Sequence, residues 1–175
     1  MVAYKLPYTI EDYQMWEGDW ELINGDAIAM APSPFGPHQA IMSEIIFQLK
    51  TSLQKCLKSC FIYPETDYII DDLNVFRPDI SVVCKKVKEH IITTPIMVVE
   101  ILSKSTAIKD TTIKFETYQK EGIEFYLIVD YEKQSFKLYQ LQNGRYSKLN
   151  TDEEFSIKLK ECDVDFDSKM WWEAL

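Results

Sequence analysis

The sequence predicts an α/β fold in which helices cover both faces of a mixed β-sheet. Short apolar runs of strand length alternate with stretches that repeat apolar residues at helical spacing. Some of these runs are nearly continuous and β-branched, as in central strands, and two Asn-Gly dipeptides stand between alternating apolar segments. The chain has 175 residues without an evident repeat or linker, so we expect one domain over residues 1–175.

The N-terminal part predicts a short helix, a hairpin and a long helix. Thr9 can cap a helix over residues 10–16. Residues 20–30 should form a hairpin around Asn24-Gly25, followed by a loop over 31–37. A long amphipathic helix should run from His38 to about Ser59, because apolar residues recur there at helical spacing: Ile41, Ile45, Leu49, Leu53 and Leu57.

The C-terminal part predicts further strands around one helix. In order, we expect strands within 61–84 that are broken by an acidic turn at 71–72, a central strand over 95–102, a helix over 107–121 that ends at Gly122, a strand over 124–130, a hairpin over 135–149, and a last strand with a short terminal segment within 155–172.

The charge of the chain argues against a simple nucleic-acid binder. The net charge is −9, and phosphates repel an acidic protein. Residues 77–120 are the exception, because they hold eight Lys or Arg and five acids and so carry +3, which leaves −12 for the remainder. These lysines either flank strands for solubility or form a basic face.

Several features of the sequence indicate a cytoplasmic protein. No apolar stretch approaches 18 residues and the N-terminus has no signal-peptide pattern, so we expect neither a membrane span nor a membrane partner. Four cysteines, none in a C-x-x-C pair, fit the cytoplasm as reduced thiols: Cys56, Cys60, Cys84 and Cys162.

Two carboxylates occupy apolar runs that should be buried strands. Asp79 opens "RPDISVV" and Glu100 lies inside "MVVEIL". Alternation places Asp79 on the face of Ser81 and Val83, and Glu100 on the face of Val98. If the strands are neighbours, the two carboxylates lie side by side and repel, which a divalent cation would relieve. Oxygen ligands in small number suit Mg²⁺, and Mn²⁺ is an alternative.

Lys114 is a candidate partner of this acid pair. It lies four residues after Asp110 and four before Tyr118, at the edge of the apolar face of the predicted helix. From there the ammonium group can reach Glu100, where it would orient an attacking water or stabilise a phosphoryl transition state. The alternative is a solvated lysine that pairs with Asp110 across one helical turn.

Glu21 and His38 are weaker candidates. Glu21, in "WELING", would add a ligand from a hairpin strand, or it is an ordinary solvent-facing strand residue. His38 would contact a phosphate or transfer a proton, or it is a boundary residue at the start of the long helix.

Together these stretches resemble the Uma-two group of restriction endonucleases, within the PD-(D/E)xK nuclease superfamily. The resemblance covers roughly Thr9 to Leu141 and rests on the order of these pieces: "YTIEDY", "WELINGDAIAM", "PSPFGPHQ", "RPDISVV", "VVEILSKST", the spacing of Asp110, Lys114 and Tyr118, and "EGIEFYLIVD". It implies a restriction-endonuclease-like α/β core and a metal-dependent phosphodiesterase site.

The resemblance also implies roles for particular residues. Asp79 matches the aspartate of the PD motif, and Glu100 matches the acid of the second motif. The superfamily usually has a lysine two residues after that acid, where this chain has Leu102. The lysine would then be Lys114, on the following helix. Glu21 matches a recurrent position of the family and would be an accessory metal ligand; His38, Asp110 and Tyr118 would be accessory residues.

The expected reaction is hydrolysis of a DNA phosphodiester, with Mg²⁺ held by Asp79 and Glu100 and with Lys114 acting on the attacking water. Leu102 and the net charge of −9 leave two alternatives open. One is a nuclease fold that no longer cleaves and serves as a binding or regulatory module. The other is a metal-dependent hydrolase of a smaller phosphodiester. A homodimer is a further expectation, because many nucleases of this architecture dimerise to cut both strands.

Overall fold

The computed structural model describes residues 6–30, 36–56, 59–103 and 107–175. Five helices are present in this part of the chain: α1 (Ile10–Tyr13), α2 (Gly36–Cys56), α3 (Ala107–Thr111), α4 (Ile113–Lys120) and α5 (Ser168–Glu173). The strands are β1 (Trp20–Ile23), β2 (Asp26–Ala29), β3 (Phe61–Pro64), β4 (Tyr68–Asp71), β5 (Asn74–Phe76), β6 (Ile80–Val83), β7 (Met97–Ile101), β8 (Phe125–Asp130), β9 (Ser135–Gln142), β10 (Arg145–Lys148), β11 (Glu154–Leu159) and β12 (Cys162–Asp167).

The main sheet has six strands in the order β10-β9-β8-β7-β6-β3. Only the central pair β7–β8 is parallel and every other pair is antiparallel, so the predicted mixed sheet is confirmed. The parallel pair needs a crossover, and helices α3 and α4 provide it. Strands β6, β7 and β8 are buried almost throughout, as expected of continuous apolar runs that are covered on both faces.

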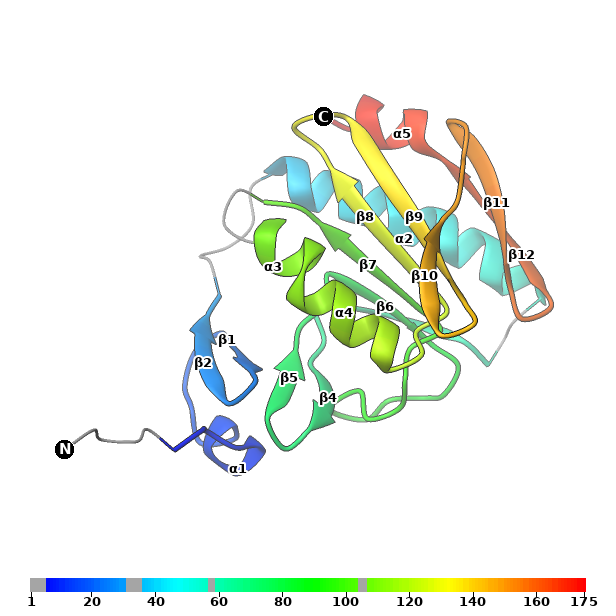
Figure 1. Cartoon of the computed structure of the whole chain (residues 1–175). Helices are drawn as coiled ribbons and strands as arrows, with labels where there is room; N and C mark the ends of the chain where they lie inside the picture. Colours follow the sequence, from blue (N-terminus) through cyan, green and yellow to red (C-terminus); the bar gives the residue numbers. More distant parts are fainter. Residues whose placement is uncertain (1–5, 31–35, 57–58, 104–106) are drawn as a thin grey trace.

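Helices cover both faces of this sheet, as predicted (Figure 1). The long helix α2 packs on one face through Ile41, Ile45 and Leu49, which share a core cluster with Ile80 and Val99. The opposite face packs against α4, whose buried residues include Lys114 and Tyr118. Glu100 lies between core residues on β7, on the α4 side of the sheet.

A second, four-stranded sheet lies beside the main one, in the order β2-β1-β5-β4 (Figure 1). The predicted hairpin is present, and Asn24 and Gly25 both have positive φ, 52° and 77°. Gly25 is also required for space, because a Cβ there would lie 2.3 Å from Cβ of Pro7. Strand β1 pairs with β5 through Leu22 and Val75, which brings the first hairpin next to the segment that leads to Asp79.

Some boundaries differ from the prediction. The helix expected over 107–121 is divided at Thr112 into α3 and α4. The C-terminal strand is in fact a hairpin, β11–β12, followed by α5. The long helix begins at Gly36 rather than at His38. The predicted loop at 31–35 and residues 57–58 of the predicted helix lie outside the described residues.

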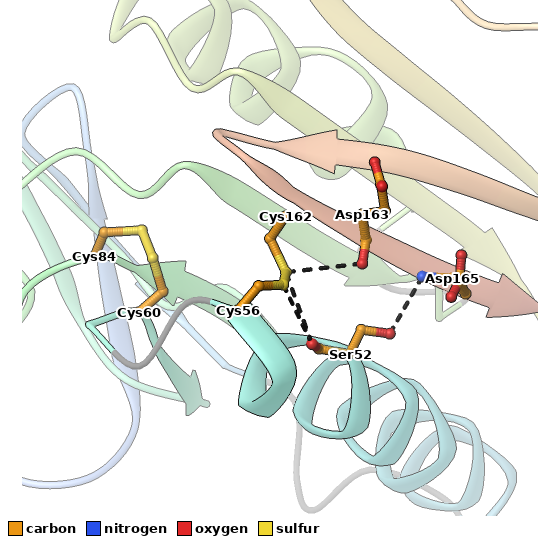
Figure 2. Close-up of a disulfide and its surroundings, with 7 residues drawn as sticks. All are labelled: Ser52, Cys56, Cys60, Cys84, Cys162, Asp163 and Asp165. Carbon is orange, nitrogen blue, oxygen red and sulfur yellow. Dashed lines mark hydrogen bonds between the residues drawn. A yellow bond between two sulfur atoms is a disulfide. The ribbon is translucent and has the colours of Figure 1, made fainter.

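The expectation of four reduced thiols is wrong for this structure, because the cysteines form two disulfides (Figure 2). Cys56, at the end of α2, is bonded to Cys162 at the start of β12. Cys60 is bonded to Cys84, across the antiparallel pair β3–β6. The partners are 106 and 24 residues apart, so spacing along the chain gave no sign of them.

No helix in the described ranges is both long and apolar enough to cross a membrane.

Candidate functional site

Asp79 and Glu100 are neighbours across two paired strands. Strands β6 and β7 are antiparallel, with Ile80 opposite Val99. Asp79 comes one residue before Ile80 and Glu100 one residue after Val99, so the same register sets them opposite each other. The condition on which the predicted acid pair depended, that the two strands are adjacent, is therefore met.

Asp79 is held in place from two sides. Its Oδ2 accepts a hydrogen bond of 2.6 Å from the backbone N–H of Ile101, on the neighbouring strand. The same oxygen lies 3.3 Å from Nε2 of His38, in the first turn of α2. The long helix thus brings its N-terminal histidine to the PD aspartate, and His38, although it lies at the start of the helix, is buried.

Lys114 lies among three carboxylates. Its Nζ is 2.8 Å from Oε1 of Glu100, 3.1 Å from Oε1 of Glu21 and 3.4 Å from Oδ1 of Asp110. The side chain is only 3% exposed, so the alternative of a solvated lysine is wrong, although the pair with Asp110 across one helical turn exists. The hydroxyl of Tyr118, one turn later on α4, donates to the same oxygen of Glu100 at 2.9 Å.

Lys114 occupies the place beside Glu100 that a lysine at position 102 would otherwise take. Leu102 packs against the core cluster that contains Val98 and Tyr118. The ammonium group instead reaches Glu100 from α4, because the crossover helix lies on the same face of the sheet as the Glu100 side chain. A lysine that is 14 residues away in sequence therefore stands beside the acid.

Glu21 is fully buried, so its reading as a solvent-facing strand residue is wrong. Its Oε1 accepts a hydrogen bond of 2.9 Å from the backbone N–H of Arg77 and faces Lys114. Its Oε2 forms an ion pair with Nζ of Lys109, on α3. The first hairpin thus contributes a carboxylate to the same cluster as Glu100.

Sequence reasoning missed Lys109 and Arg77 as members of the site, although both were counted in the basic segment. Arg77 extends the network outward, since its side chain pairs with Asp67 at 2.7 Å and Asp19 at 2.5 Å. The Tyr13 hydroxyl donates to Asp67 at 2.9 Å, which ties α1 to the same network. The only signal in the sequence was the position of Arg77 and Lys109 next to predicted site residues.

The ionisation of these groups depends on their burial and on their neighbours. Burial acts to raise the pKa of Glu21, but attraction to Lys114 and Lys109 outweighs it and holds that pKa below its ordinary value. Burial acts to lower the pKa of Lys114, but attraction to the three carboxylates raises it well above its ordinary value. Lys114 is therefore charged.

Glu100 behaves differently from Glu21. Burial raises its pKa well above the ordinary value; Lys114 opposes this, and the nearby charges of Asp110 and Asp79 add to it. For His38, burial acts to lower the pKa, but the hydrogen bond and the charge of Asp79 outweigh it, so the pKa is raised. Burial is thus the main cause of the Glu100 shift, whereas Asp79 is the main cause of the raised pKa of His38.

The donor set fits a divalent cation at the acid pair. The cluster holds four carboxyl groups (Glu21, Asp79, Glu100 and Asp110) and two ammonium groups (Lys109 and Lys114), so the acids outnumber the lysines by two. The hydrogen bonds and the histidine contact described above reach only Oδ2 of Asp79 and only Oε1 of Glu100. Two carboxylates plus water and a substrate phosphate are a usual Mg²⁺ environment.

A complete protein-only metal centre is not present in the described part of the chain, where no three His, Cys, Asp or Glu side chains form a ligand group. The ligand roles of Asp79, Glu100 and Glu21 stay predictions.

The basic segment 77–120 does not form one face. Lys85 and Lys86 are exposed beyond the end of β6, whereas Asp79 precedes its first residue, so these lysines are at the other end of the strand. Near the acid pair, Arg77, Lys109 and Lys114 are all engaged in ion pairs. Among the residues that the structure describes, the positive charge near the acid pair is therefore largely neutralised by ion pairs within the chain.

Comparison with known protein families gives one match, over residues 10–162, to the Uma2 family, which is described as "Putative restriction endonuclease". The chain belongs to this family. The matched range includes every residue of the Uma2 site described above. No curated protein matches.

The fold of this Uma2 protein is also that of a solved structure. A crystal structure from Anabaena variabilis, described as a "putative nuclease belonging to DUF820", superposes with a TM-score of 0.77. The match covers 96% of this chain and 99% of that one, at 20% sequence identity. At this identity the likeness establishes the shared nuclease-like fold.

Proposed function

We propose that this Uma2-family protein is a metal-dependent endonuclease that hydrolyses phosphodiester bonds in DNA. One observation carries the proposal: the β6–β7 register sets Asp79 beside Glu100, while Lys114 of α4 lies 2.8 Å from Glu100. Two acids on neighbouring strands and a lysine beside them are the groups that a metal-assisted attack of water on phosphorus needs.

Each residue has a separate role in this proposal. Asp79 and Glu100 would hold Mg²⁺, or Mn²⁺ in its place, which when bound would polarise the scissile phosphate and lower the pKa of a bound water. Lys114, charged and buried, would orient that water and stabilise negative charge that develops on the phosphate. His38 and Tyr118 would fix the orientation of the two acids through the hydrogen-bonding contacts described above.

The test is a calorimetric titration of Mg²⁺ and Mn²⁺ combined with a nicking assay on supercoiled plasmid. In Asp79→Asn the contact to the Ile101 N–H can be kept, so the fold should survive while the charge is lost. We expect metal affinity to fall at least about tenfold and nicking to fall to background. Glu116→Gln, an exposed carboxylate on the helix that carries Lys114, is the matched control and should behave as wild type.

Lys114 provides a second arm of the same test. Lys114→Met should keep metal binding and lose nicking by about two orders of magnitude or more, and the exposed Lys120→Met on the same helix is its control. Metal binding by the wild type without any nicking would mean that the substrate is not DNA. A wild-type protein that binds neither ion would contradict the catalytic proposal altogether.

A second candidate function is the hydrolysis of a smaller phosphodiester, and the neutralised lysines around the site favour it. A short substrate needs few phosphate contacts, whereas a long duplex needs many. The salt dependence of substrate binding separates the two.

A further inference from the structure

Glu21 differs from the other acids of the site in how its oxygens are used. Oε1 accepts the Arg77 N–H at 2.9 Å and lies 3.1 Å from Nζ of Lys114. Oε2 is in contact with Nζ of Lys109. The carboxylate is fully buried and is therefore enclosed by cationic and N–H donors.

This environment is unsuited to a metal ligand. A carboxylate has about four lone-pair positions, and three of those of Glu21 already face donors. A divalent cation bound there would also stand close to two ammonium groups and be repelled by both. At Asp79 and Glu100, in contrast, the contacts described above reach only Oδ2 and only Oε1.

We propose that Glu21 is a positioning residue, which holds the ammonium groups of Lys114 and Lys109, and is not a ligand of the metal. Its carboxylate contacts Nζ of Lys114 together with Glu100, and it also holds Lys109, of whose side chain 18% is exposed. The inference rests on the proposed metal-dependent function and assigns Glu21 a different role from that of Asp79 and Glu100.

Glu21→Gln is the informative variant, because its amide oxygen can still accept the Arg77 N–H while the negative charge is lost. We expect the Mn²⁺ dissociation constant to stay within about threefold of wild type, whereas in Asp79→Asn it rises at least about tenfold. We expect kcat for nicking to fall about 10- to 100-fold, with a smaller change in KM. The melting temperature of each variant shows whether it is folded.

A double-mutant cycle with Lys114→Met tests whether Glu21 acts through that lysine. If it does, Glu21→Gln combined with Lys114→Met should be no slower than Lys114→Met alone. If the two substitutions reduce the nicking rate independently, so that their effects multiply in the double variant, the inference is overturned. A tenfold loss of Mn²⁺ affinity in folded Glu21→Gln would also overturn it. If Glu21→Gln does not fold, Lys109→Met with Lys114→Met removes both partners, and wild-type Mn²⁺ affinity is then expected.

The failure of this inference is distinguishable from that of the proposed function. If the wild-type protein binds no metal, both the proposed function and the positioning role of Glu21 are wrong. If the wild-type protein binds Mn²⁺ and Glu21→Gln does not, only the positioning role is wrong, and Glu21 is a metal ligand.

Discussion

At the scale of single residues, the acid pair owes its chemistry to an imbalance of charge. Three carboxyl groups, those of Glu21, Glu100 and Asp110, surround the ammonium group of Lys114, and Asp79 lies opposite Glu100. Carboxyl groups therefore outnumber ammonium groups in the cluster, which is costly in a protein interior. Burial raises the pKa of Glu100 well above its ordinary value, and the neighbouring carboxylates keep Lys114 charged. A bound cation would reduce this cost, which is a physical reason for the sheet to contain these acids.

His38 leads to a prediction about pH. Its pKa in the folded protein is raised above the ordinary value of 6.5, so the folded state holds the proton more tightly than the unfolded state. Its stabilising effect is complete below about pH 6.5 and is lost as pH rises through the folded-state pKa. His38→Gln should therefore lower the melting temperature more at about pH 6 than at about pH 8.

The measurement is a series of thermal melts of both proteins in the presence of a chelator, which removes competing metal from Asp79. His90→Gln is the control, because that side chain is 43% exposed and lies 3.7 Å from Asp67, away from Asp79. An equal loss of melting temperature for His38→Gln at both pH values would contradict the raised pKa.

At the scale of elements, the site is assembled by three connections between segments distant in sequence. The β6–β7 pair joins Asp79 to Glu100, the β7–α4–β8 crossover brings Lys114 over the same face, and the first hairpin contributes Glu21. The Cys56–Cys162 disulfide is a fourth connection, which fastens hairpin β11–β12 to the end of α2 (Figure 2). Helix α2 in turn carries His38 at its other end.

The Cys56–Cys162 disulfide leads to a prediction about stability. It closes a loop with a sequence separation of 106 residues, for which chain entropy gives an upper value of about 5 kcal/mol. Oxidised Cys56→Ser/Cys162→Ser should melt roughly 10 °C below oxidised wild type. The Cys60–Cys84 disulfide closes a shorter loop, with a separation of 24 residues. Its removal in Cys60→Ser/Cys84→Ser should therefore lower the melting temperature less.

Peptide mapping without reductant checks the pairing directly, and melts with and without dithiothreitol check its effect. Reductant should lower the melting temperature of the wild type. It should not change the melting temperature of a variant in which all four cysteines are replaced by serine. Four free thiols in protein purified without reductant would contradict the disulfides. Cytoplasmic proteins normally keep their thiols reduced, so the two disulfides stand against the expected cytoplasmic location.

At the scale of the whole molecule, the distribution of charge limits how the protein can hold nucleic acid. The chain carries −9, the exposed lysines after β6 are at the end of that strand away from Asp79, and Lys109 and Lys114, the described lysines at the site, are paired. Few phosphates can then be neutralised close to the acid pair. This favours a short contact with the substrate over an extended basic groove.

The corresponding prediction is a shallow salt dependence of DNA binding. With about two phosphates neutralised, the slope of log K against log salt should be about −2 for a duplex, measured by fluorescence anisotropy with Asp79→Asn to prevent cleavage. Lys109→Met should reduce the slope by about one, and Lys85→Met should leave it unchanged. A slope near −6 would contradict this and indicate a long basic surface.

The sequence by itself determined the main elements and indicated candidate site residues, whose chemical roles stay predictions. Apolar periodicity and two Asn-Gly turns predicted the sheet, its hairpins and the covering helices, because these signals are local. The predicted site residues Glu21, Asp79, Glu100, Asp110 and Lys114 lie close together, and alternation along the strands correctly placed Asp79 and Glu100 on one face of the sheet.

Only the tertiary structure decided what these groups contact. That Glu21 is buried between two lysines depends on how the first hairpin packs beside β5, and local spacing carries no information about that. The same holds for the contact of His38 with Asp79 and for the two disulfides, whose partners lie far apart in the chain. A residue's type and face are local properties, whereas its partners and its pKa depend on which distant segments the fold brings to it.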